Sequence, residues 1–300
     1  MEPHRWAAFA LALAPALALM PLAAAVSGRR WRDEFLWTAA GLGAASAILG
    51  ALLAWPGTIL AKAMADPARA ALANAFFGAG LAEEAAKLAI VLGAALRHYE
   101  ADRPGDPFTV AVAVALGFAG FENLFYVIEA EKWHATAVVR ALTAVPMHGL
   151  QGCLMGALLL AGRRAEALLW PMLLHAAYDW PLMAAESMPA DRAAWTGLWL
   201  GVMLVAGGTG FAATRAALRL VGGPPAAPRA LRRGGLALTI LALLMGPGLA
   251  ALTTLAGPPD WTAIFSAISA AVLPATLGLI LWTLPQRQMA QAAPADRLAS

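Results

Sequence analysis

Nine apolar runs, each about 20 residues or longer, divide almost the whole chain, and a run of that length can cross a bilayer as one helix. The runs are Trp6–Val26, Phe35–Trp55, Ala70–Leu96, Thr109–Ile128, Thr136–Ala161, Ala167–Ala185, Ala193–Leu218, Gly234–Ala256 and Trp261–Leu284. Hydrophobic residues make up 61% of the chain and charged residues 13%, whereas soluble domains have about 45–50% and about 25%. The sequence therefore predicts an all-α fold, a polytopic membrane bundle of about nine transmembrane helices.

Basic residues lie mainly in the short segments between these runs. The net charge of +3 and the pI near 9.4 therefore indicate orientation in a membrane, and we expect no nucleic-acid partner. The segment Gly28–Arg32 is the most basic of them, and basic flanks stay in the cytoplasm. This places the N-terminus outside and the C-terminus inside. It also favours a membrane helix over a cleaved signal peptide for the first run.

The polar residues divide the chain into four parts. Residues 1–69 form transmembrane scaffold helices and a loop, and residues 70–186 form a catalytic transmembrane core. Residues 187–285 form further scaffold helices, and residues 286–300 form a disordered cytoplasmic tail. Within the first part, Pro56–Arg69 fits an external loop, a short surface helix or a re-entrant turn equally well.

Three charged residues stand inside the third run: Glu83, Glu84 and Lys87. A charge near the centre of a bilayer costs about 2.5–3.5 kcal/mol on insertion scales, so it marks a functional site by default. Lys87 lies one helical turn from both glutamates, and we expect ion pairs that offset part of this cost.

The next three runs contribute the other polar residues. Glu122 and Asn123 belong to the fourth run, His148 to the fifth, and His175 with Asp179 to one face of the sixth. Counted at 1.5 Å per residue from the outer helix ends, Glu83, Glu122, His148 and His175 share one depth. We therefore predict a four-helix catalytic core.

Several residues call for no catalytic role. Cys153 is expected to be a small buried hydrophobe, and His4, His98 and His134 lie in termini or loops. The glycines of the fourth and fifth runs are expected at close helix contacts. A lone membrane carboxylate or histidine can also serve packing, but a whole set at one depth would need separate compensation for each member.

Imidazole and carboxylate groups from separate helices suit a divalent metal such as zinc with one position left for water. A remaining glutamate could then act as general base. Without a metal, a glutamate can still deprotonate water while a histidine stabilises the oxyanion. Both versions are hydrolytic, and the residues do not separate them.

The segment Glu-Glu-Ala-Ala-Lys at 83–87, Phe118–Asn123, His148 and then His175 with Asp179 resembles the PrsW family of intramembrane proteases. The resemblance covers about Ala70 to Ala185. It implies a multi-pass protease of the bacterial inner membrane, usually described as a metalloprotease, that cleaves membrane-associated proteins such as anti-sigma factors.

The resemblance also implies roles for individual residues. Glu83 would be the water-activating base, with Glu84 paired to Lys87 or sharing the site. Glu122 and His175 would be further catalytic residues. The metal ligands would be Glu122, His148 and His175. Lys87, Asn123 and Asp179 would support them.

Two other functions stay open at this point. A proton- or cation-coupled transporter could use the same carboxylates and histidines as a relay. Against it stand the absence of a visible internal repeat and the concentration of polar groups in one layer. An inactive membrane scaffold of the same fold is the second alternative.

Overall fold

The computed structural model describes residues 3–24, 26–30, 32–97, 101–222, 232–244 and 261–284. These residues form helices and connecting turns, with no strand among them, which confirms the all-α prediction. Six helical stretches in the described part are long and apolar enough to cross a membrane: Trp6–Ala24, Glu34–Lys62, Asp106–Glu129, Trp133–Leu160, Pro189–Leu220 and Ser266–Thr283. The protein is therefore an all-α membrane bundle.

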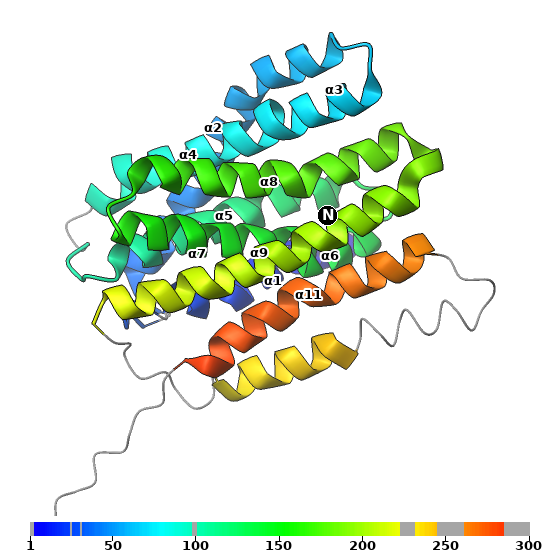
Figure 1. Ribbon diagram of the computed structural model, residues 1–300. Coiled ribbons are helices and arrows are strands. Elements are labelled where there is room, and N and C mark those ends of the chain that lie inside the picture. Colours follow the sequence, from blue (N-terminus) through cyan, green and yellow to red (C-terminus); the bar gives the residue numbers. More distant parts are fainter. Residues whose placement is uncertain are drawn as a thin grey trace, which may run out of the picture.

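The long helices run roughly along one direction in Figure 1. The α-helices, long and short, are α1 (Pro3–Ala24), α2 (Glu34–Lys62), α3 (Pro67–Ala73), α4 (Leu81–Gly93), α5 (Asp106–Glu129), α6 (Trp133–Leu142), α7 (Ala144–Leu160), α8 (Arg164–Ser187), α9 (Arg192–Leu220) and α11 (Trp261–Thr283). Residues 232–244 are also helical, while the rest of the predicted run to Ala256, and the predicted tail at 286–300, lie outside the described residues.

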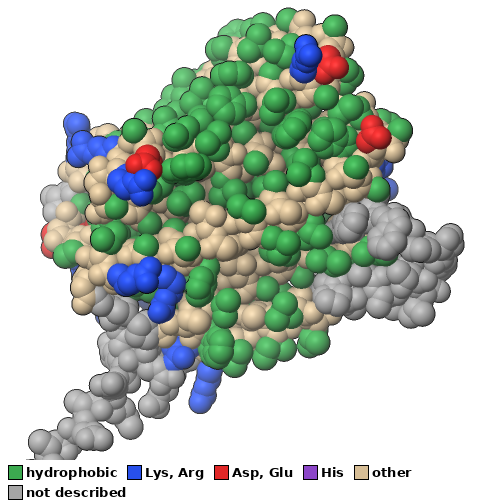
Figure 2. All heavy atoms as spheres, in the orientation of Figure 1, with side chains coloured by type: hydrophobic (Ala, Val, Ile, Leu, Met, Phe, Trp, Pro, Cys, Tyr) green, Lys and Arg blue, Asp and Glu red, His purple; other side chains and the backbone are tan. Residues whose placement is uncertain are grey.

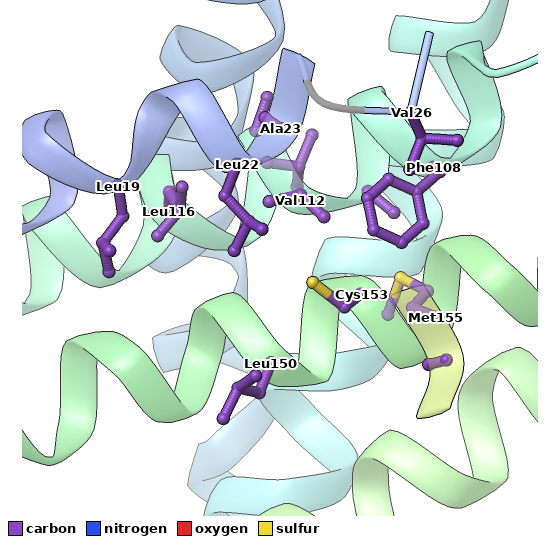
Figure 3. Packing of buried hydrophobic residues seen from close by; sticks show 14 of the residues in the cluster. Leu19, Leu22, Ala23, Val26, Phe108, Val112, Leu116, Leu150, Cys153 and Met155 are labelled. Carbon is purple, nitrogen blue, oxygen red and sulfur yellow. The ribbon is translucent and has the colours of Figure 1, made fainter. Parts of the chain in front are cut away.

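Helix α5 forms the centre of the bundle and packs against α1, α2 and α7. Most of its side chains are buried, because neighbours cover it on several sides. Figure 3 shows Leu22 of α1 and Val112 of α5 close to Cys153 and Leu150 of α7. Cys153 is buried in this apolar cluster, as predicted.

The predicted third transmembrane helix is not one regular α-helix. A π-helical stretch, Asn74–Gly80, joins α3 to α4, and α4 ends at Gly93 instead of continuing to Leu96. The stretch packs between α2 and α8. A Cβ atom on Gly80 would lie 2.8 Å from the carbonyl oxygen of Met172 in α8, so the backbones meet here at a distance that only glycine allows.

The segment Pro56–Arg69 is resolved by the structure. Helix α2 continues through Pro56 to Lys62, a short turn follows, and α3 begins at Pro67 with Asp66 as its N-cap. The segment is a helix end and a tight connection between two helices, which is none of the three arrangements expected for it.

The predicted fifth helix is broken at Thr143 into α6 and α7. Pro146 explains the break, because its ring would clash with the carbonyl group of Leu142 in a continuous helix and it lacks the N–H that this carbonyl would bind. The prediction of one helix over Thr136–Ala161 was therefore wrong at this point. Helix α6 contacts α1, α5 and α7.

Glycines in α5 and α7 lie at close helix contacts, as the sequence indicates. A Cβ atom on Gly156 would come within 2.6 Å of the Cα atom of Phe108, and one on Gly152 within 2.9 Å of the Cα atom of Val112. These contacts let α5 and α7 approach closely enough for side chains on both to meet.

A buried ion-pair cluster ties three segments together at one end of the bundle. Arg29, in the loop after α1, donates from Nε to Asp106 at 2.8 Å and from NH2 to the other oxygen of Asp106 at 2.9 Å. Its NH1 group donates to Asp33 at 3.1 Å. The hydrogen bonds that Arg29 donates to Asp106 raise the pKa of Arg29 above its usual range. Arg29 is thus a packing element as well as a basic loop residue.

Apolar side chains cover most of the face seen in Figure 2, and Lys, Arg, Asp and Glu side chains lie mainly toward its margins. Large exposed apolar residues such as Leu52, Trp55 and Leu204 lie on α2 and α9. This distribution is typical of a surface that faces lipid.

Candidate active site

The first turns of α4 carry the charged residues that the sequence singled out. Nζ of Lys87 lies 2.7 Å from Oε1 of Glu84 and 3.7 Å from Oε2 of Glu83, so both predicted ion pairs form. The side chains of Glu84 and Lys87 are each 1% exposed, whereas that of Glu83 is 16% exposed. Glu83 is therefore the carboxylate of this pair that is open to the surroundings.

Lys87 also reaches α5 and α7. Its Nζ atom lies 3.9 Å from the centre of the Phe118 ring and 3.1 Å from Nδ1 of His148. A cation over an aromatic face and two carboxylates beside it offset the burial of the charge. The ammonium group therefore joins α4 to both neighbouring helices.

His175 projects from α8 toward the glutamates of α4. Its Nδ1 atom lies 2.9 Å from Oε1 of Glu84, and because a carboxylate can only accept, Nδ1 donates. Its Nε2 atom lies 3.3 Å from Oδ2 of Asp179 and 3.7 Å from Oε2 of Glu83. Glu84 thus orients the ring, and Nε2 faces the two more exposed carboxylates.

His148 of α7 is held from two sides. Its Nε2 atom lies 3.0 Å from Oε2 of Glu122, so Nε2–H donates to this carboxylate. Its Nδ1 atom, left with a lone pair, accepts from Lys87. The rings of His148 and His175 meet edge to face with centroids 5.2 Å apart.

A further basic residue, Arg140 of α6, completes the arrangement. It was not among the predicted site residues. Its NH2 group donates to Oε2 of Glu122 at 2.8 Å, and its Nε donates to Oδ1 of Asn123 at 2.9 Å. Asn123 in turn donates to the carbonyl oxygen of Ala12 in α1 at 2.6 Å. The sequence did hold a signal, since an arginine inside an apolar run is costly without a partner.

The structure thus brings together the predicted residues on α4, α5, α7 and α8 through this network. His134 packs edge-on against Trp133. The side chains of His4 and His98 lie outside the described residues.

One donor atom each from Glu83, His148 and His175 lie within 4.8 Å of one another. Oε2 of Glu83 is buried and makes no hydrogen bond among the described residues, although Nζ of Lys87 and Nε2 of His175 each lie 3.7 Å away. Two imidazoles and a carboxylate are a donor set that suits zinc. These three residues therefore fit a divalent metal.

This cluster differs in one member from the predicted ligands. The sequence pointed to Glu122 with the two histidines, whereas the geometric cluster contains Glu83 with the same histidines. Oε2 of Glu122 is engaged by Arg140 and His148. Glu122 therefore lies behind His148, where it contacts the ring nitrogen that carries the proton.

Comparisons with known proteins identify a family whose model matches more than half of the chain. Residues 32–208 match the PrsW family intramembrane metalloproteases, a range that begins before and ends after the motifs. Protease PrsW of Geobacillus kaustophilus is 33% identical over 150 residues, which cover 46% of this chain and 66% of that protein. Protease PrsW of Halalkalibacterium halodurans is 33% identical over 147 residues, covering 44% and 66%.

A third relative, Protease PrsW of Bacillus subtilis, is 34% identical over 122 residues, covering 37% of this chain and 55% of that protein. The chain thus spans just under two thirds of the length of the first of these relatives. No solved structure gives a significant match. The apolar helices and these bacterial relatives indicate a multi-pass bacterial membrane protein. By the match over residues 32–208, the chain belongs to the PrsW family of intramembrane metalloproteases.

Proposed function

We propose that this protein is an intramembrane endopeptidase that hydrolyses peptide bonds of membrane-embedded or membrane-anchored proteins. The observation that carries the proposal is the meeting of Glu83, His148 and His175 within 4.8 Å, inside an apolar helical bundle. Buried titratable groups with specific partners are typical of active sites. The family match supports the same reaction class.

In the preferred form of this proposal, Glu83, His148 and His175 hold a divalent ion, with zinc as the first candidate. When bound, such an ion would polarise the scissile carbonyl group and make a water molecule more acidic. Glu84 holds His175 by its Nδ1 atom, and Glu122 holds His148 by its Nε2 atom. Carboxylates behind ligating histidines fix the ring orientation and raise the basicity of the ligand.

The same geometry supports a metal-free form. Oε2 of Glu83 has no hydrogen-bond partner among the described residues and could take a proton from water. Lys87 and His175, both within 3.7 Å of this oxygen, would balance the charge. Glu83 is the general base in this form and a ligand in the first.

The substrate and the topology are further parts of the proposal. By family resemblance we expect a single-span membrane protein of the anti-sigma-factor type. The distribution of basic residues favours an N-terminus outside and a C-terminus in the cytoplasm. No described contact and no relative supports transport.

Metal analysis of the detergent-purified protein tests the proposal. We expect close to one zinc per chain, lost in His148→Ala and in His175→Ala. His134→Ala is the matched control, because His134 contacts Trp133 on α6. Absence of metal from the unmodified protein, together with cleavage of a reporter substrate, would select the metal-free form, and absence of both would refute the proposal.

A further inference from the structure

Arg140 occupies an unusual place for a residue near the end of a short helix. Its side chain is only 15% exposed, and its guanidinium group lies 3.8 Å from the centre of the Tyr126 ring. The same group donates to Glu122 and to Asn123, which are neighbours on α5. One planar fork is therefore held by three residues of a single helix.

The consequence of this fork lies at Glu122. Oε2 of Glu122 accepts from NH2 of Arg140 at 2.8 Å and from Nε2 of His148 at 3.0 Å. An ionised carboxylate cannot donate, so its position decides which nitrogen of His148 carries the proton. With Nε2 protonated, the lone pair of Nδ1 is on the side where Lys87 lies.

The direction of this lone pair matters for the site. Nδ1 of His148 is 3.1 Å from Nζ of Lys87, and that Nζ is 3.7 Å from Oε2 of Glu83. The lone pair thus faces Nζ of Lys87, which in turn lies beside the carboxylate of Glu83. The opposite tautomer would direct its lone pair at the carboxylate of Glu122, where two electron-rich atoms would repel each other.

We propose that Arg140 is a positioning residue of the active site. It holds Glu122 against Nε2 of His148 and so fixes the tautomer in which the lone pair of Nδ1 faces Lys87, beside Glu83. The inference rests on the proposed function for its role in catalysis. Its geometric part concerns Arg140, Glu122 and His148 alone. Lysine cannot replace the fork, since one ammonium group cannot bind Glu122 and Asn123 with the same planar geometry.

The test is nitrogen NMR of the metal-free protein labelled with ¹⁵N-histidine. The signals of His148 are identified by their loss in His148→Asn. In the unmodified protein we expect Nδ1 without a proton and Nε2 with one. In Arg140→Gln we expect a partial shift toward the tautomer with a proton on Nδ1, limited by Lys87, whose ammonium group still donates to Nδ1. Arg192→Gln is the matched control, because Arg192 is an exposed arginine at the start of α9, and it should leave the spectrum unchanged.

Zinc affinity provides a second readout that does not depend on cleavage. Loss of a residue behind a ligating histidine lowers metal affinity by about 10- to 100-fold, and we expect this range for Arg140→Gln. The zinc affinity of Arg140→Lys should fall between those of the unmodified protein and Arg140→Gln, because lysine keeps the charge beside Glu122 but loses the bond to Asn123. Arg140→Met, which keeps an unbranched apolar stem, replaces the Gln variant if the latter does not accumulate in membranes.

The outcomes separate this inference from the proposed function. A single unchanged tautomer of His148 in Arg140→Gln or Arg140→Met would overturn the positioning role, whatever happens to zinc affinity. A tautomer mixture with unchanged zinc affinity would support the positioning role and count against His148 as a metal ligand. Failure of the unmodified protein both to bind zinc and to cleave substrate would refute the proposed function, and the tautomer experiment would remain decisive for the positioning role.

Discussion

Glu84 and His175 are joined by a contact of 2.9 Å although 91 residues separate them in the chain. The same oxygen of Glu84 lies 2.7 Å from Nζ of Lys87. One buried oxygen therefore fixes an imidazole of α8 and an ammonium group of α4. The stability of this arrangement and its chemistry depend on the same atom.

Glu84→Gln should lower stability and activity together. It leaves Lys87 buried with only Glu83 as a carboxylate partner, and breaking one side of a buried ion pair costs about 3–5 kcal/mol. Thermal unfolding in detergent measures this loss. Lys87→Met should destabilise the protein similarly, and the double variant should lose less than the sum of the two. Strict additivity would show that the pair is not coupled.

Glu83→Gln should abolish cleavage of a reporter substrate while membrane insertion and abundance stay at the level of the unmodified protein. Glu83 is a ligand or a base in the two forms of the mechanism, and the amide can be neither an anionic ligand nor a base. Its 16% exposure predicts a smaller loss of stability than for Glu84→Gln. Retained cleavage would remove Glu83 from both roles.

Removal of metal should stop the reaction in the preferred form of the mechanism. Treatment of the purified protein with 1,10-phenanthroline should abolish cleavage, and added zinc should restore it, because Glu83, His148 and His175 remain in place to bind it again. The non-chelating isomer 1,7-phenanthroline is the control. Equal activity with both compounds would argue for the metal-free form.

Gly80→Ala should impair the site from outside it. The new Cβ atom would lie 2.8 Å from the carbonyl oxygen of Met172, so α4 must move away from α8 and Glu84 from His175. We expect lower thermal stability and slower cleavage. Gly93→Ala, at the far end of α4, is the matched control, since its Cβ would meet nothing within 4 Å. Equal effects of both changes would contradict this account.

Arg29→Gln should destabilise the bundle without a direct effect on the site. Asp106 is 1% exposed and would be left with an unbalanced charge, at a cost of about 3–5 kcal/mol. Arg30→Gln, at an exposed neighbour, is the control. Because the folded pKa of Arg29 is raised above its ordinary value, its contribution is fully present below that ordinary value and should not vary across neutral pH. A loss of stability between pH 6 and 9 that depends on Arg29 would contradict this.

The sequence was sufficient to predict the all-α membrane bundle and the polar residues that meet in it. Long apolar runs can only be helices in a bilayer, and charges within them must find one another. Glu83, Glu84, His148 and His175 could be named for this reason. Their individual roles stay predictions.

Three features were missed, and only one of them, the pairing of two arginines, depends on partners far away in the chain. From the sequence, the segment Gly28–Arg32 was expected to orient the protein and Arg140 had no assigned role, whereas Arg29 pairs with Asp106 and Arg140 with Glu122. Apolar runs also do not reveal where a helix changes its winding, so the π-helical stretch Asn74–Gly80 was missed. The break at Thr143 was open to prediction from Pro146, but the apolar run concealed it.

The bond from Asn123 to Ala12 has a consequence for how this architecture can vary among relatives. Asn123 binds a main-chain oxygen of α1, so the bond does not depend on a particular side-chain group at position 12, although that buried position has room only for a small residue. Helix α1 lies before the matched range of 32–208, yet it binds Asn123, the residue to which Nε of Arg140 donates. This main-chain hydrogen bond can persist when side chains of the first helix change, and an alignment of sequences would not reveal it.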